Sequence, residues 1–196
     1  MLKGSTLYEI DFSNSNLKYA NLSNVLLNGF LIDANLAGAS LKSSRIENAD
    51  FSDANLKDVD FSDANLKYVK FHNSIINENT KLPPKWFQIW KIHNTNVKNQ
   101  KFNNIDLSNT NLDDIDFTNG SLANTNLNGA KLWNAKLCGV NLSNADLRNT
   151  EIFATDFTDI NFKNALVDNM ALYKNIGVSR SLKLELESRG AKFLQD

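Results

Sequence analysis

The sequence predicts an all-β solenoid. Leu or Phe returns at every fifth residue along most of the chain, and the residues between are mostly Asn, Asp, Ser, Lys and Gly. A helix turns by about 100° per residue and would scatter such residues around its surface, whereas a straight strand would send them to alternate faces. The backbone must therefore turn within every five residues, so that one apolar column lies inside a coiled chain.

The repeat occupies two blocks, residues 1–76 and residues 97–176. The register of the second block does not slip. In the first block one residue is missing between Leu27 and Leu31. Because a change of one residue turns a core face outward, we expect a distorted corner near Gly29.

Each pentapeptide also carries a small or β-branched residue two places before the Leu or Phe, as in residues 49–63, ADFSDANLKDVDFSD. An extended local backbone puts both residues on one face, so each repeat supplies two inward side chains and a corner. This iterated Ala-(Asn/Asp)-Leu-x-x pattern resembles the pentapeptide-repeat family. The resemblance implies four pentapeptides per coil of a right-handed quadrilateral β-helix, and hence about eight coils.

A coil of this kind stacks residues that are twenty apart in the sequence, and opposite charges in one outward column should then pair. Asp116, Lys136 and Asp156 alternate in sign in this way, and Lys131 precedes Glu151 by one coil. The charge pattern therefore agrees with the coil length, although each exposed ion pair contributes little stability.

Residues 77–96 interrupt the repeat with a predicted helical insertion. Two Pro precede a stretch in which Trp86, Ile89, Trp90 and His93 fall at helical spacing, and Pro is well placed at the start of a helix. We expect this helix to pack on the solenoid or to cover the joint between its blocks. A partner site or dimer contact at the two Trp is the alternative. Leu-Pro-x-Lys-Trp insertions are similar to those of cyanobacterial family members, which implies a cyanobacterial source.

Residues 177–196 are predicted to form a C-terminal capping helix. Ser179 is a candidate N-cap, Leu182 and Leu186 form an apolar stripe, and Gly190 is a stop signal. An open solenoid end would expose core side chains and unpaired strand edges. The alternative is a dimer contact through this helix, so we expect a monomer or such a dimer, with all four segments forming one continuous structural domain.

No catalytic, metal-binding or cofactor-binding motif interrupts the repeat. His72 and His93 lie in different segments without zinc-site spacing, and His72 is expected to be a solvated outward residue. The regularly spaced carboxylates lack the Gly-rich loops of calcium sites. Cys138 is the single cysteine, so no internal disulfide can form, and no basic group activates its thiol. We therefore expect no enzyme, no metal and no cofactor.

The chain has 21 basic and 22 acidic residues and a formal net charge of −1 at pH 7. This balance creates no strong field toward nucleic acid or an anionic membrane. The start of the chain lacks an apolar run of secretory length, and no stretch is long and apolar enough to span a bilayer. We expect a cytoplasmic protein with an unknown protein partner and no direct nucleic-acid or membrane partner.

One surface feature is exceptional. Trp133, Phe153 and Tyr173 are each twenty residues apart, and each follows an inward Leu or Ile. In a four-sided coil these side chains form an exposed aromatic ladder on one face, a candidate partner surface together with Trp86 and Trp90. The alternative is that the C-terminal helix or the insertion folds over the ladder.

These observations predict a non-enzymatic protein-binding, scaffold or regulatory solenoid of unknown target. The resemblance implies an alternative, because some family members imitate B-form DNA and bind a type II topoisomerase such as gyrase. Those mimics resemble acidic rods, and a mimic should approach the dense negative charge of the duplex. This chain instead places cations on outward positions, namely Lys101, Lys131, Lys136, Arg148 and Lys163.

Overall fold

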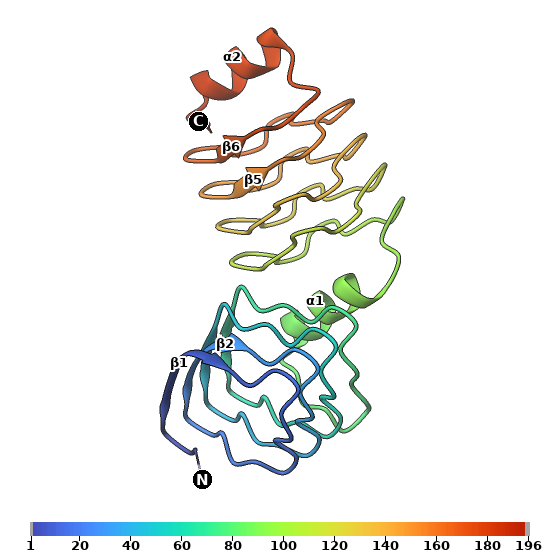
Figure 1. Cartoon of the computed structure of the whole chain (residues 1–196). Helices are drawn as coiled ribbons and strands as arrows, with labels where there is room; N and C mark the ends of the chain where they lie inside the picture. Colours follow the sequence, from blue (N-terminus) through green and yellow to red (C-terminus); the bar gives the residue numbers. More distant parts are fainter. Residues whose placement is uncertain (1, 195–196) are drawn as a thin grey trace. The chain divides into compact units, whose positions relative to one another are not determined.

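The computed structural model describes residues 2–194 and shows the predicted right-handed quadrilateral β-helix (Figure 1). The chain forms two compact units, the first ending at Thr95 and the second beginning at Asn96. Within each unit the chain is a stack of coils, and each coil pairs with the next through parallel bridges such as Asn35 with Asn55 and Ser121 with Asn141. The stacking of residues twenty apart is therefore confirmed.

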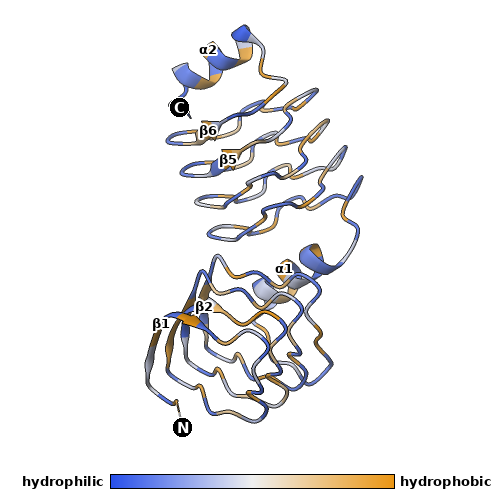
Figure 2. Ribbon diagram, in the orientation of Figure 1, coloured by the Kyte–Doolittle hydropathy of each residue, from blue (hydrophilic) through white to orange (hydrophobic). Residues whose placement is uncertain are grey.

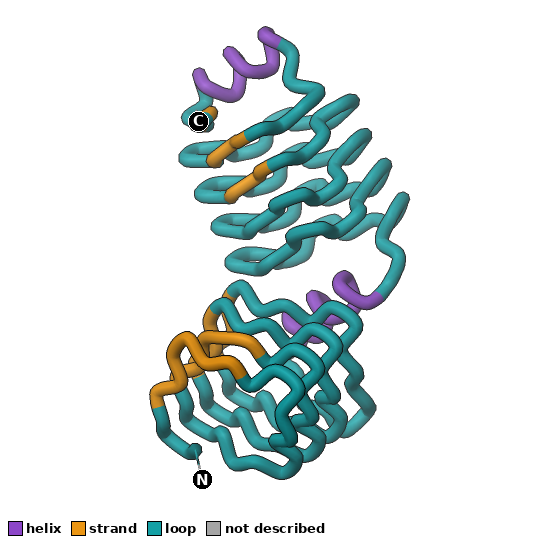
Figure 3. Tube along the Cα trace, in the orientation of Figure 1, coloured by secondary structure: helices purple, strands orange, loops and turns teal. Residues whose placement is uncertain are grey.

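Most coil sides are single bridges, so Figure 3 draws most of the chain as loop and only short segments as strand. The first unit has a parallel sheet in the order β1-β2-β3-β4, followed by helix α1, and the second has a parallel sheet in the order β5-β6-β7 and helix α2. The bounds are β1 Thr6–Asp11, β2 Leu26–Phe30, β3 Arg45–Glu47, β4 Asn65–Lys67, α1 Pro84–Asn94, β5 Glu151–Phe153, β6 Ala171–Tyr173, α2 Arg180–Ser188 and β7 Lys192–Phe193.

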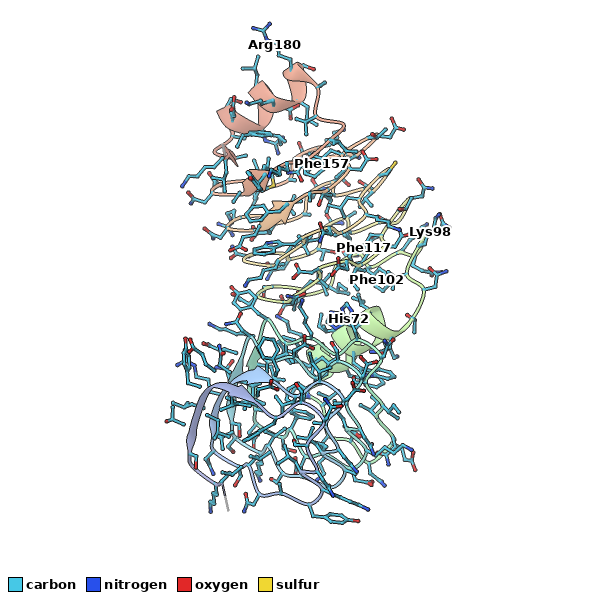
Figure 4. All side chains as sticks on the ribbon, viewed as in Figure 1. His72, Lys98, Phe102, Phe117, Phe157 and Arg180 are labelled. Carbon is cyan, nitrogen blue, oxygen red and sulfur yellow. The ribbon has the colours of Figure 1, made fainter. Side chains whose placement is uncertain are left out.

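The core of each unit is the predicted column of Leu and Phe side chains. Phe51, Phe61 and Phe71 are fully buried, and their ring centroids lie 5.8 to 6.4 Å apart. In the second unit, labelled in Figure 4, the rings of Phe102 and Phe117 meet edge to face at 6.1 Å. Small residues two places before many of these positions are buried too, so each such repeat supplies two inward side chains, and apolar and polar colours alternate along the coils in Figure 2.

The corner of each repeat requires a left-handed backbone. The residue two places after the inward Leu or Phe has a positive φ in nearly every described repeat, for example 58° at Asn24, 60° at Asp53 and 57° at Asn144. Asn and Asp tolerate this conformation better than other residues with side chains. The recurrence of Asn in the sequence follows partly from this requirement.

The distorted corner near Gly29 is confirmed. Leu7 pairs with Leu27, but Ile10 pairs with Gly29, so β1 carries one more residue than β2 between these pairs. Gly29 has a φ of 145°, and a Cβ there would lie 2.1 Å from the carbonyl oxygen of Ile10. The missing residue is therefore absorbed by a bulge in the neighbouring coil.

Helix α1 closes the C-terminal end of the first unit. Its Trp86, Ile89, Ile92 and His93 are buried, as the helical spacing predicted for three of them. The coil continues further into the insertion than expected, because Lys81 still pairs with Asp60.

The expectation that His72 is solvated was wrong. Its ring is half-buried and lies 4.5 Å from the ring of His93. The Nδ1 atom of His93 accepts a hydrogen bond of 3.1 Å from the backbone N–H of Phe71. Because α1 packs over this outward position, a residue that five-residue periodicity assigns to solvent becomes covered.

Helix α2 and strand β7 lie at the C-terminal end of the second unit. The hydroxyl of Ser179 caps α2 by accepting a hydrogen bond of 3.1 Å from the N–H of Leu182, and Leu186 is buried, as predicted. After Gly190 the chain returns to the stack, where β7 pairs with β6. The sequence predicted the helix but not this strand. Among residues 2–194, neither helix has the length and apolar character that a membrane crossing needs.

Candidate partner-binding surface

The side chains of Trp133, Phe153 and Tyr173 stack as predicted, and we call these three residues the aromatic ladder. The rings of Trp133 and Phe153 are 5.1 Å apart with an interplanar angle of 27°. The rings of Phe153 and Tyr173 are 5.9 Å apart at 76°. The parallel pairing of β5 with β6 sets this stack, because Phe153 is opposite Tyr173 while Ile152 and Leu172 point into the core.

The donor groups of Trp133 are held by two carboxylates. Its backbone N–H donates to Oδ1 of Asp113 at 2.9 Å, and its indole Nε1 donates to Oε2 of Glu151 at 3.1 Å. Two hydrogen bonds at opposite ends of the residue fix the ring on the face of the coil. The ring still has 42% of its surface exposed, so none of the described elements covers it.

The ladder continues one step beyond the residues that the sequence indicated. The N–H of Leu194 donates to the carbonyl of Leu172 at 2.8 Å, which places Leu194 after β7 as Tyr173 follows Leu172. Leu194 is 47% exposed and lines a shallow pocket with Tyr173 and Phe193. Sequence reasoning missed Leu194 because it did not predict β7.

Lysines surround the ladder. The Nζ atom of Lys131 lies 5.9 Å from the centroid of Trp133, and that of Lys174 lies 4.8 Å from the centroid of Tyr173. From α2, Lys183 lies 5.1 Å from the ring of Phe193, and Lys192 of β7 is exposed opposite Ala171. Cations at these distances are attracted to the ring faces.

The other two predicted surface residues, Trp86 and Trp90, belong to the first unit. Trp86 is buried, with its ring 6.3 Å from that of Phe71. Trp90 is half-buried and donates from Nε1 to the carbonyl of Ser74 at 3.1 Å. Of the helix aromatics, Phe87 is the exposed one and stacks on Trp90 at 6.1 Å. The two Trp side chains therefore attach α1 to the coils.

The geometry of coils, corners and inward column coincides with a known sequence family. The family model for pentapeptide repeats matches the chain in eight copies, over residues 2–31, 44–77 and 125–164, which is more than half of its length. The chain belongs to the pentapeptide-repeat family.

Several solved pentapeptide-repeat structures are similar to this pentapeptide-repeat protein. One, from the thylakoid lumen of Arabidopsis thaliana, is 20% identical over 83% of this chain and 71% of that chain, with a TM-score of 0.29. HetL from Nostoc sp. strain PCC 7120, described as involved in heterocyst differentiation regulation, is 21% identical over 84% and 83%, with a TM-score of 0.26. QnrB1, a plasmid-mediated fluoroquinolone resistance protein, is 16% identical over 95% and 94%, with a TM-score of 0.22. No curated protein matches the chain.

The carboxylates of this pentapeptide-repeat protein serve its turns. Within residues 2–194 there is no group of three or more His, Cys, Asp or Glu side chains that could hold a metal ion. Hydrogen bonds from Ser62 and Thr118 lower the pKa of Asp60 and Asp116, and the Arg148 guanidinium lowers the pKa of Asp146. The shifted carboxylates thus have local partners within their own repeats.

Proposed function

We propose that this chain is a non-enzymatic binding protein whose second unit presents the aromatic ladder to a protein partner, as part of a scaffold or regulatory role. The observation that carries the proposal is the exposed stack of Trp133, Phe153 and Tyr173 on a face that the repeat otherwise fills with polar residues. Trp and Tyr are enriched among the residues that dominate binding energy at protein interfaces.

The coil provides a rigid base for such a surface. Backbone hydrogen bonds join successive coils at each step, for example from Asn134 to the carbonyl of Phe153 and from Ala154 to that of Tyr173, both at 2.8 Å. A surface that is already ordered loses little conformational entropy when a partner binds. Pentapeptide-repeat proteins are generally non-enzymatic, and we extend this to the present chain, together with a cytoplasmic location.

The duplex-mimic alternative lacks support from the charges around the ladder. Lys131, Lys174, Lys183 and Lys192 lie on this face, whereas a mimic of DNA should present dense negative charge. We expect purified protein at micromolar concentration to leave the supercoiling activity of gyrase unchanged. Inhibition in this assay would favour the alternative.

Affinity capture from a lysate of the source organism tests the proposal. The wild-type chain is compared with a Trp133→Ser, Phe153→Ser variant and with a matched control, Leu26→Ser with Phe30→Ser, which removes two apolar side chains that are 51% and 55% exposed on the first unit. We expect a protein that the wild type and the control retain and the ladder variant loses. An identical set of captured proteins for all three chains would overturn the proposal.

A further inference from the structure

We propose that the aromatic ladder binds an acidic amphipathic helix of the partner, lying along the stack of coils. This inference rests on the proposed function and names the chemistry of the partner. It follows from the charge of the face, the spacing of the rings and the pocket at the end of the ladder.

The charge around the ladder favours an acidic partner. Lysines approach the apolar row from the strand columns, the corner after Tyr173 and helix α2: Lys131, Lys192, Lys174 and Lys183. The carboxylates of Asp113 and Glu151 on the same face accept the two hydrogen bonds of Trp133. On α2, Glu187 lies 3.9 Å from Lys183, but both side chains are exposed and such a pair is weak. Acidic side chains of a partner would therefore meet a surplus of cations, and complementary charge steers association and fixes register.

The ring spacing favours a helix over a strand. The centroid distances along the ladder are 5.1 and 5.9 Å. Neighbouring side chains on one helix face, at i and i+3 or i+4, are about 5–6 Å apart, whereas same-face residues of an extended strand repeat at roughly 6.8 Å. A helix that runs along the ladder can thus place one apolar side chain beside each ring, in the helix-in-groove mode.

The orientation of the rings disfavours a nucleic acid. Bases bind single-strand-binding proteins by stacking on open aromatic faces. Here the faces of Trp133 and Phe153 are turned toward each other at 27°, and Phe153 and Tyr173 meet edge to face. The ladder therefore offers ring edges, against which aliphatic side chains of a helix pack.

A pocket at the end of the ladder suits the anchor residue of such a helix. It has a volume of about 210 Å³ and is lined on one side by Tyr173, Phe193 and Leu194 and on the other by Lys174 and Lys183. Small-molecule sites usually exceed roughly 300 Å³, so this pocket is better matched to one Leu or Phe side chain. The lysines at its rim would contact acidic residues that flank the anchor.

Selection from a random sixteen-residue peptide library displayed on phage tests the inference. The bait is the full chain, with counter-selection against the folded Trp133→Ser, Phe153→Ser variant. We expect enriched peptides with apolar residues at i, i+3 or i+4 and i+7 and a net negative charge. The best synthetic peptide should bind the Lys131→Glu, Lys192→Glu variant at least tenfold more weakly than wild type, and the matched control Lys101→Glu, Lys163→Glu within twofold of wild type.

Three results would overturn the inference: no ladder-dependent enrichment, enrichment of basic or alternating strand-like peptides, or tighter binding of a single-stranded oligonucleotide or an anionic phosphatidylserine vesicle than of the best peptide. These failures are distinguishable from failure of the proposed function. If lysate capture still yields a protein that depends on the ladder, the surface binds a partner of different chemistry.

Discussion

At the scale of single residues, Asn and Asp have two separate tasks in each repeat. After the inward residue they adopt the left-handed conformation of the corner, as at Asn134 with a φ of 56°. Before it, the side-chain oxygen accepts a hydrogen bond from the backbone N–H two residues on, as Asn141 does from Ser143 at 3.0 Å and Asp116 from Thr118 at 3.0 Å. Both tasks follow from the need to turn every five residues and to satisfy the turn's backbone groups.

Exchange of corner residues tests the first task. Asn134 and Ala154 occupy equivalent corners of successive coils, with φ values of 56° and 53°. We expect Ala154→Asn to raise the free energy of unfolding by about 0.5–1 kcal/mol and Asn134→Ala to lower it by a similar amount, because Ala pays more for a left-handed backbone. Chemical denaturation measures both, and a change of the same sign in the two variants would contradict this role.

The pH dependence of stability tests the second task. The pKa values of Asp60, Asp116 and Asp146 are lowered in the folded chain from the ordinary value of 3.8. A group whose folded pKa is depressed adds stability that is present above the unfolded pKa and is lost as pH falls through the folded pKa. We expect the urea midpoint to be level from pH 7 to about pH 5 and to fall below about pH 4.

An Asp60→Asn, Asp116→Asn variant is the control for this prediction. Asn provides the same acceptor oxygen, as Asn141 does in its own repeat, but does not titrate. Its urea midpoint should therefore fall less steeply below pH 4 than that of the wild type. Equal slopes for the two chains would show that other groups govern acid unfolding.

At the scale of elements, the stability of each coil depends on closing the irregular places of the repeat. The bulge opposite Gly29 absorbs the missing residue, α1 closes the end of the first unit, and α2 with β7 lies at the end of the second. Helix α2 is joined to the last coil by Arg189, which donates hydrogen bonds to the carbonyls of Ala165 and Phe162. Unpaired backbone groups at a solenoid end are thereby reduced.

Substitution of Gly29 tests the bulge. A Cβ at Gly29 would collide with the backbone of Ile10, so we expect Gly29→Ala to cost about 3 kcal/mol or more. Gly4 also has a positive φ, of 71°, but nothing lies within 4 Å of its Cβ position. Gly4→Ala should cost only about 1 kcal/mol. Similar losses in thermal denaturation would contradict a specific close approach at Gly29.

Two neighbouring aromatic residues test the cap formed by α1. Trp86 is buried against Phe71, whereas Phe87 is 40% exposed on the other side of the helix. We expect Trp86→Ala to lower the free energy of unfolding by about 3–5 kcal/mol and Phe87→Ala by about 1 kcal/mol. A larger loss for Phe87→Ala, measured by urea denaturation, would mean that the outer face of α1 is its packing face.

At the scale of the whole molecule, periodicity alone predicted the coil, the stacking of residues twenty apart, both helices and the three rings of the ladder. Features that depend on which segments meet were not predictable. The two residues of β7 are too short for a strand signal and are fixed by their pairing with Ala171 and Leu172. His72 has an outward position in the repeat and is covered because α1 happens to pack there. Leu194 and Lys183 joined the candidate site for the same reason.

The central claim is that Trp133 and Phe153 serve a partner and that the Leu and Phe column serves the fold. The free energy of unfolding of the Trp133→Ser, Phe153→Ser variant tests this division directly, with Phe157→Ala in the buried column as the reference. We expect the double variant to lose about 2 kcal/mol or less, while Phe157→Ala alone loses about 3–5 kcal/mol. A loss in the double variant as large as that of the core substitution would show that the ladder is part of the packed structure and contradict the account.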